Sequence, residues 1–204
     1  MIGIIDYGSG NVSAISTLLD KQKIGHVITS DAAALKTMDK YILPGVGAFD
    51  PSMNTLRSTG LVDILNEQVL SNKKPVLGIC VGMHLLAEGS EEGSTPGLNW
   101  IPGHVRKIKI DPNTPAPHLP HMGWNSIETQ HDSPLFSNID KEVGFYFLHS
   151  YYFDAAFPKD IAATVNFPTA LTCGVIHDNI YGMQFHPEKS HLNGMTLFKN
   201  FEDL

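Results

Sequence analysis

The sequence predicts an α/β fold: a single doubly wound, mostly parallel sheet with flanking helices and an antiparallel excursion. Short apolar runs such as residues 2–5 alternate with helical patterns such as residues 12–19, and this alternation is typical of βαβ units. The runs are apolar throughout, as expected of parallel strands that are covered on both faces. The alternation lapses over residues 98–127, which we therefore expect to form the antiparallel excursion on the edge of the main sheet.

The expected elements follow one another along the whole chain. Strands are expected at residues 2–5, 26–29, 41–43, 75–79, 105–110, 145–153, 172–176 and 181–185. Helical patterns cover residues 12–19, 50–71 with a break near Gly60, 81–86 and 192–201. Residues 111–120 are rich in proline and are expected to form a loop.

Composition indicates a compact enzyme rather than a nucleic-acid or membrane protein. The chain has 204 residues, of which 42% are hydrophobic, enough for one good-sized core. Its net charge of −7 argues against a surface that neutralises phosphates. The longest apolar stretch falls short of the roughly 20 residues that a membrane-spanning helix needs. Two cysteines are too few for a disulfide framework, and with no leader segment apparent we expect a cytoplasmic protein.

The chain is organised around a G-x-C-x-G pattern formed by Gly78, Cys80 and Gly82, between an apolar run and a helical pattern. This pattern predicts a nucleophile elbow with sulfur as the nucleophile, in which larger neighbours than glycine would collide. Such a turn sets Cys80 at a helix N-terminus, where N–H groups favour a thiolate. The same groups can hold an oxyanion, and the Val81 N–H is the natural donor. The alternative is that Cys80 is a small buried hydrophobe.

A base for this nucleophile is predicted about a hundred residues downstream. The run at residues 181–185 ends in His186-Pro187-Glu188, and the proline restrains His186 to an extended conformation. Glu188 can then orient the imidazole, which completes the logic of a Cys–His–Glu triad. His149 is the main competitor for the role of base, but no acidic residue accompanies it. Cys173 lies in a strand-like run without an elbow and is interpreted as structural.

Several motifs together resemble the class I, triad-type glutamine amidotransferases, and more narrowly the glutaminase subunits of imidazole glycerol phosphate synthase. They are IDYGSGN, LPGVGAF, GICVGMH, PHMGWN, FYFLHSY and GMQFHPEKS, which span nearly the whole chain. The resemblance implies one glutamine amidotransferase domain over residues 1–204 and no cofactor. It also implies that the chain hydrolyses glutamine through a cysteine thioester. A (β/α)8-barrel cyclase subunit would receive the ammonia within a heterodimer, and make imidazole glycerol phosphate and aminoimidazole carboxamide ribotide.

The resemblance also carries further site residues onto matching positions of this sequence. By resemblance, the second oxyanion donor is a backbone N–H of Val46 or Gly47, in a loop that could also turn its N–H away. Residues implied to bind glutamine are Gly45, His84, Glu92, Ser150 and Tyr151. Candidates for the partner interface are Asn11, Trp124, Tyr146 and Lys189. The sequence departs from the family at His84, where elbows usually carry glutamine.

Other functions stay open from the sequence. A paralogous amidotransferase could supply ammonia for amidation of a bacterial cell-surface sugar. A triad peptidase, or a non-catalytic relative of the same fold, is a more distant alternative. A zinc site built from His118, His121 and His131 is disfavoured, because their spacing is irregular and no other ligands converge with them, so we expect no metal.

Overall fold

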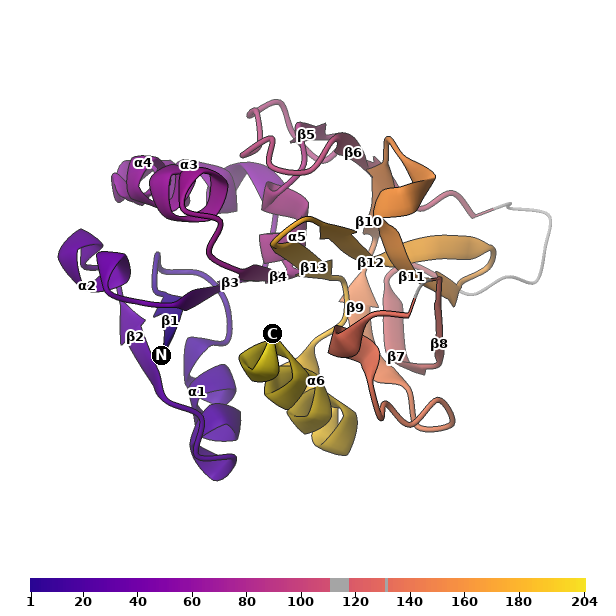
Figure 1. Ribbon diagram of the computed structural model, residues 1–204. Helices are drawn as coiled ribbons and strands as arrows, with labels where there is room; N and C mark the ends of the chain where they lie inside the picture. Colours follow the sequence, from indigo (N-terminus) through magenta and orange to yellow (C-terminus); the bar gives the residue numbers. More distant parts are fainter. Residues whose placement is uncertain (111–117, 131) are drawn as a thin grey trace.

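The computed structural model describes residues 1–110, 118–130 and 132–204, and its centre is an eight-stranded sheet (Figure 1). The strand order is β2-β1-β3-β4-β13-β12-β11-β8. The strands in chain order are β1 (Ile2–Ile5), β2 (His26–Thr29), β3 (Lys40–Gly45), β4 (Val76–Cys80), β8 (Ile127–Thr129), β11 (Ile161–Asn166), β12 (Ala170–His177) and β13 (Ile180–Met183). The pairings from β2 to β13 are parallel, and those from β13 to β8 are antiparallel. The mostly parallel α/β sheet expected from the sequence is therefore confirmed.

Helices cover both faces of this sheet, as a doubly wound fold requires (Figure 1). One face carries α2 (Ala32–Lys36), α3 (Phe49–Ser58), α4 (Leu61–Asn66) and α5 (Val81–Leu85). The other carries α1 (Val12–Lys21) and α6 (His191–Asp203). A π-helical turn at Glu67–Ser71 extends α4, and 3-10 turns lie at Pro134–Phe136, Pro158–Asp160 and Pro187–Lys189.

The helices dock through apolar side chains at helical spacing. In α1, Ile15 and Leu19 are fully buried because residues four apart lie on one face of a helix. The predicted break near Gly60 is confirmed, since Gly60 adopts a φ of 71° between α3 and α4. No helix among the described residues is long and apolar enough to cross a membrane.

The antiparallel excursion is placed differently from the prediction. Of the strands described in this region, β8 alone joins the edge of the main sheet, whereas two others build separate small sheets. The strand β6 (Gly103–Lys107) lies between β5 (Gly89–Ser90) and β10 (Tyr151–Ala155), and β7 (His121–Asn125) pairs with β9 (Phe145–His149). Their partners are distant in sequence, so the local pattern carried no information about this pairing. Most of the proline-rich loop, residues 111–117, lies outside the described residues.

The aromatic run at residues 145–153 is two strands rather than one. It breaks at Ser150, so that β9 and β10 belong to different sheets. The parallel strands β3, β4 and β13 are neighbours, and their carboxyl ends meet at one edge. This edge brings together the loop after Gly45, the turn at Cys80 and the segment that follows Met183. Ligands commonly bind at such an edge in α/β sheets.

Candidate active site

Cys80 occupies a strained turn between β4 and α5. Its φ of 54° and ψ of −113° lie in a region that residues other than glycine rarely adopt. The glycines around it are required by space, since a Cβ on Gly82 would lie 1.9 Å from the Leu43 carbonyl oxygen. A Cβ on Gly78 would lie 2.7 Å from the Gly82 carbonyl oxygen. The steric reason for the predicted elbow is thus confirmed.

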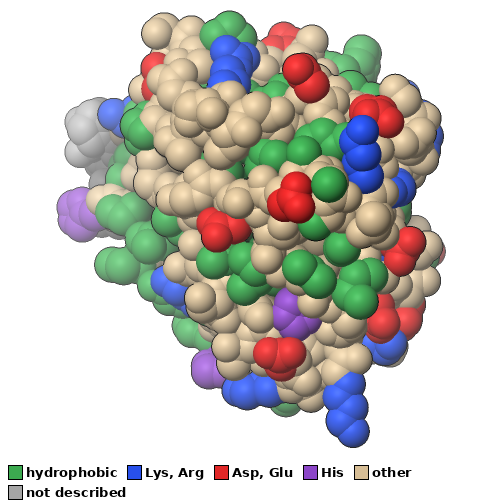
Figure 2. Space-filling view, turned by 90° about the vertical axis from the view of Figure 1, so that its left-hand side faces the viewer, with side chains coloured by type: hydrophobic (Ala, Val, Ile, Leu, Met, Phe, Trp, Pro, Cys, Tyr) green, Lys and Arg blue, Asp and Glu red, His purple; other side chains and the backbone are tan. Residues whose placement is uncertain are grey.

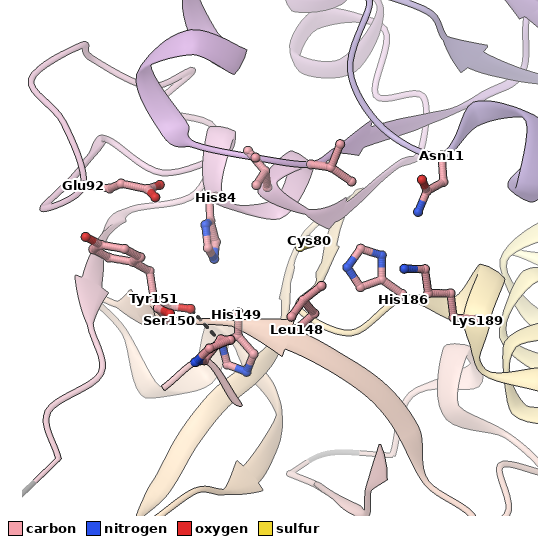
Figure 3. A pocket seen from close by; sticks show the side chains of 14 residues that line it. Asn11, Cys80, His84, Glu92, Leu148, His149, Ser150, Tyr151, His186 and Lys189 are labelled. Atoms are coloured by element: carbon pink, nitrogen blue, oxygen red, sulfur yellow. Dashed lines mark hydrogen bonds between the residues drawn. The ribbon is translucent and has the colours of Figure 1, made fainter. Parts of the chain in front are cut away.

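The Cys80 side chain faces a cavity of about 540 Å³ (Figure 3). In this view His84, Glu92 and Tyr151 lie toward one end, and Asn11, His186 and Lys189 lie toward the other. The residues that line the cavity are Asn11, Val46, Gly47, Cys80, Val81, His84, Glu92, Pro120, Leu148, His149, Ser150, Tyr151, His186 and Lys189. Most of these residues come from the loops after β1 and β3, from the end of β4 with α5, from β9 and the start of β10, and from the turn after β13.

A buried ion pair lies beside the nucleophile. His186 Nδ1 is 2.8 Å from Glu188 Oε1, and both side chains are almost completely buried. The Asn11 amide donates a 2.7 Å hydrogen bond to the same carboxylate oxygen, from 177 residues away in the sequence. Glu188 Oε2 is buried without a hydrogen-bond partner among the described residues. Asn11, which resemblance offered only as an interface residue, therefore also holds the carboxylate that faces His186.

Charge and burial oppose each other in this pair. Burial by itself lowers the pKa of His186, but hydrogen bonds to Cys80 and Glu188 and the negative charges of both groups raise that pKa to about 10. Burial by itself raises the pKa of Glu188, but the hydrogen bond and charge of His186, with a hydrogen bond from Asn11, lower that pKa below its ordinary value. The site therefore favours an imidazolium paired with the Glu188 carboxylate.

This pair makes stability depend on pH. The raised pKa of His186 stabilises the folded state. This stabilisation is fully present below pH 6.5 and is lost as the pH rises toward about 10. The lowered pKa of Glu188 contributes stability that is complete above 4.5 and is lost as the pH falls. We therefore expect the difference in free energy of unfolding between the native protein and Glu188→Gln to be largest between pH 4.5 and pH 6.5. The difference should become smaller at lower and at higher pH.

Urea unfolding across the pH range measures this difference. Glu142→Gln is the matched control, because Glu142 is exposed, and its difference should stay flat with pH. A flat profile for Glu188→Gln as well would contradict the charged pair.

His149, the competing candidate base, is held differently. Its Nδ1 donates to the Tyr151 carbonyl oxygen at 2.8 Å, and its Nε2 accepts from His121 Nδ1 at 2.9 Å. Burial, with smaller contributions from nearby histidines, lowers the pKa of His149 to about 3, and the hydrogen bond to the Tyr151 carbonyl oxygen opposes this shift. His121 is stacked between Phe147 and Phe167, and burial lowers its pKa to about 4. Within the described part of the chain, these neutral histidines have no carboxylate partner of the kind that His186 has.

The loop after β3 also lines the cavity, through Val46 and Gly47. The Val46 N–H donates a 3.1 Å hydrogen bond to Ser9 Oγ, and Ser9 Oγ donates to the Val46 carbonyl oxygen at 3.1 Å. Gly47 follows with a φ of 93°. Gly45 packs against the elbow instead of lining the cavity, because a Cβ there would lie 2.5 Å from the Gly82 nitrogen. In this structure the Val46 N–H is thus committed to Ser9.

The other end of the cavity carries the groups expected to bind glutamine. Glu92 Oε2 accepts a 2.9 Å hydrogen bond from the Phe49 N–H at the start of α3. His84 is buried with its Nε2 2.7 Å from Gln184 Oε1, and its Nδ1 has no hydrogen-bond partner among the described residues. Ser150 and Tyr151 line the same end. The structure therefore brings four of the five expected glutamine-binding residues to one cavity.

Three of the four expected interface residues, Trp124, Tyr146 and Lys189, lie next to one another. Trp124 stacks on His191 with ring centroids 5.2 Å apart, and it meets Tyr146 edge-on at 6.4 Å. Lys189 Nζ lies 5.5 Å from the centre of the Tyr146 ring. The side chain of Trp124 is part of an exposed surface, with 43% of the residue accessible.

Two residues of the site were not singled out from the sequence. Ser9 and Gln184 belong to the IDYGSGN and GMQFHPEKS motifs, but neither motif predicts a role for them. Gln184 is completely buried, which is unusual for glutamine, but burial of one polar residue beside a strand leaves no periodic signal. Among the described residues no cluster of three His, Cys, Asp or Glu side chains is arranged to hold a metal ion. His131, named in the zinc alternative, lies outside the described residues.

Comparison with known protein families finds one whose model matches nearly the whole chain. A family model described as glutamine amidotransferase class-I matches residues 4–203. The chain is 45% identical over 204 residues to the imidazole glycerol phosphate synthase subunit HisH of Leptospira borgpetersenii, covering 100% of both chains. It is 46% identical over 204 residues to the HisH subunit of Bdellovibrio bacteriovorus, again covering 100% of both.

Solved structures agree on the fold. A structure described as a glutamine amidotransferase superposes with a TM-score of 0.74 at 16% identity, covering 99% of this chain and 97% of that one. PurLQS from Thermotoga maritima superposes with a TM-score of 0.69 at 15% identity, covering 99% and 97%. At these identities the match concerns the arrangement of helices and strands.

Proposed function

Because this chain belongs to the class I glutamine amidotransferase family, we propose that it is the glutaminase subunit of an imidazole glycerol phosphate synthase. Residues 1–204 act as one amidotransferase domain in the cytosol, where thiols stay reduced. Relatives at about 45% identity over their full length support this assignment. The observation that carries the chemistry is Cys80 at a strained elbow beside the buried His186–Glu188 pair. The surface-sugar alternative is not favoured by the names of these relatives.

In the first half of the reaction, the Cys80 thiolate attacks the side-chain carboxamide of glutamine. The oxyanion that forms is held by the Val81 N–H and by an N–H of the loop at Val46 and Gly47. His186 enters this step as an imidazolium and protonates the departing ammonia. A γ-glutamyl thioester on Cys80 remains.

In the second half, neutral His186 takes a proton from water, and the resulting hydroxide attacks the thioester carbonyl. The same donors hold the second oxyanion, and its collapse releases glutamate and the Cys80 sulfur. Glu188 accepts a hydrogen bond from the Nδ1 of His186, which keeps the imidazole in one orientation, and it stabilises the positive charge that develops on the ring. No step requires a metal or an organic cofactor.

The polar end of the cavity holds the rest of glutamine. The Glu92 carboxylate pairs with the α-ammonium group of glutamine, and its Oε2 is held in place by a hydrogen bond from the Phe49 N–H. The unpartnered Nδ1 of His84 can accept an N–H from the substrate, since its Nε2 is already engaged by Gln184. The Ser150–Tyr151 segment binds the α-carboxylate. These contacts favour free glutamine over a peptide, because a glutamine residue inside a peptide has no free α-ammonium or α-carboxylate group.

The ammonia acceptor belongs to a partner, a (β/α)8-barrel cyclase subunit, in a heterodimer. It makes imidazole glycerol phosphate and aminoimidazole carboxamide ribotide. The β7–β9 surface, defined as Met122, Trp124, Tyr146 and Leu148, suits this docking because Met122 is 64% and Trp124 43% exposed. Leu148 also lines the cavity, so a partner bound here sits beside the released ammonia. By contrast, the face that carries α2, β2 and α1 shows acidic, basic and hydrophobic side chains interspersed (Figure 2).

Complementation tests the proposed pathway. We expect a histidine auxotroph lacking this subunit to grow without histidine when it receives the chain with its own genomic partner. The chain supplied alone and the Cys80→Ala chain with the partner are the controls. Failure to grow, together with amidation of a nucleotide sugar by the native pair, would assign the ammonia to a different acceptor.

The contact between Asn11 and Glu188 predicts a kinetic defect. Asn11→Ala removes a charge-assisted hydrogen bond to the carboxylate that orients His186, so kcat should fall by about tenfold with little change in KM. The measurement is glutaminase activity at saturating partner, with Asn54→Ala on the exposed side of α3 as control. An unchanged kcat with weakened partner binding would instead support a role for Asn11 in the interface alone.

A further inference from the structure

A buried polar pair, His84 and Gln184, lies beside the nucleophile. Gln184 follows β13 and is completely buried, and His84 of α5 is 3% exposed. Gln184 Oε1 lies 2.7 Å from His84 Nε2. The Gln184 amide nitrogen donates toward Cys80 Sγ at 4.0 Å. Two polar side chains thus connect α5 to the sulfur through one amide group.

The chemistry of the pair sets the direction of each hydrogen bond. Burial lowers the pKa of His84 to about 4, despite an opposing contribution from Gln184, so the ring is neutral near pH 7. A carbonyl oxygen only accepts, and therefore His84 Nε2 carries the ring's single proton. With its oxygen held in this way, the Gln184 amide can only present its NH2 group to the sulfur. A reversed amide would set an oxygen against the sulfur and would require the other tautomer of His84, with Nε2 as the acceptor.

Resting on the proposed function, we propose that Gln184 is the hydrogen-bond donor that stabilises the Cys80 thiolate, and that His84 positions Gln184 by fixing its amide. An N–H donor to an anionic sulfur is a charge-assisted hydrogen bond, and such bonds shorten and strengthen when the charge forms. Catalytic hydrogen bonds are often long in an unliganded site and tighten in the reacting complex. The sulfur is then held by His186 and by Gln184.

This role explains why histidine can stand where elbows of the family usually carry glutamine. Glutamine also bears an N–H donor at its ε nitrogen, so either side chain can hold the Gln184 carbonyl oxygen. Asparagine places its amide nearer the backbone, at the level of the histidine Nδ1, and cannot reach that oxygen from the same position. Histidine and glutamine are therefore interchangeable in this role, and asparagine is not.

The rate of Cys80 alkylation by iodoacetamide as a function of pH tests the proposal, because only the thiolate reacts. Peptide mass spectrometry separates Cys80 from Cys173, and no glutamine or partner is needed. We expect Gln184→Met to move the midpoint of the profile upward by roughly half to one pH unit, since the donor is lost. We expect His84→Asn to move it in the same direction and His84→Gln to leave it near the native position.

An unchanged midpoint in a Gln184→Met protein with native circular dichroism would overturn the role of Gln184. If that variant does not fold, the His84 variants still decide, because equal profiles for His84→Gln and His84→Asn would overturn the positioning role. The assay is independent of substrate. Native protein that fails to hydrolyse glutamine but shows the expected alkylation contrasts would contradict the proposed function and leave this inference standing.

Discussion

Cys80→Ala is expected to reduce glutamine hydrolysis by a factor on the order of 10⁴ or more, because it removes the atom that forms the thioester. The fold should persist, since Cys80 and alanine differ by one sulfur at a site beside a cavity. The assay is glutamate release by the complex with the partner, so that the activated form of the site is measured. A glutamine analogue with an electrophilic carbon in place of the carboxamide should modify Cys80 in the native chain.

The second cysteine provides the matched control for this prediction. Cys173 lies in β12 and is completely buried, and burial raises the pKa of its thiol well above the ordinary value. Cys173→Ala should therefore keep its activity and its labelling at Cys80. Activity that survives Cys80→Ala, with labelling found on Cys173 instead, would overturn the assignment of the nucleophile.

The isolated chain is expected to hydrolyse glutamine slowly and to be stimulated roughly 10²–10³-fold by its partner with that partner's ligand bound. The physical reason is the loop after β3. The Val46 N–H donates a hydrogen bond to Ser9 Oγ, so this candidate donor is not free to bind a developing oxyanion. Loss of one oxyanion donor costs about this factor in other hydrolases. A partner that docks beside the cavity can stabilise the alternative orientation of the loop.

Ser9→Ala separates this mechanism from other forms of activation. The substitution removes both hydrogen bonds between the serine hydroxyl and Val46, so we expect the basal rate to rise by about tenfold while the stimulated rate changes little. Ser13→Ala on the exposed face of α1 is the control. Full activity in the purified native chain, or a basal rate unaffected by Ser9→Ala, would contradict the role of this contact.

The parallel part of the main sheet and β12 could be predicted because their signals are local, whereas β8 and β11 were not among the expected strands. An apolar run bounded by turn residues indicates a buried strand wherever it lies, and β1, β2 and β12 fall close to the expected positions. The small sheets could not be predicted, since β6 pairs with β10 and β7 with β9 across long stretches of chain. Alternating side chains show that a residue run is a strand but do not identify its partner.

The sequence by itself determined the elbow and the base. Gly78, Cys80 and Gly82 lie in one short stretch, so their spacing is visible in the sequence, and the clash that excludes a side chain at Gly78 lies within that stretch. The clash that excludes a side chain at Gly82 is with Leu43 of the neighbouring strand β3. His186 and Glu188 are likewise two residues apart, so their ion pair follows from a short segment. Such features are encoded locally, and a single stretch of sequence is enough to recognise them.

Only the tertiary structure decided which side chains act on these groups. Asn11 reaches Glu188, Ser9 engages Val46, and Gln184 joins His84 to Cys80. Each contact crosses between segments that follow different strands, and it exists because β1, β3, β4 and β13 lie side by side in the sheet. The order and register of the strands bring these side chains within hydrogen-bonding distance of one another. A periodic pattern along the chain contains no information about such distances.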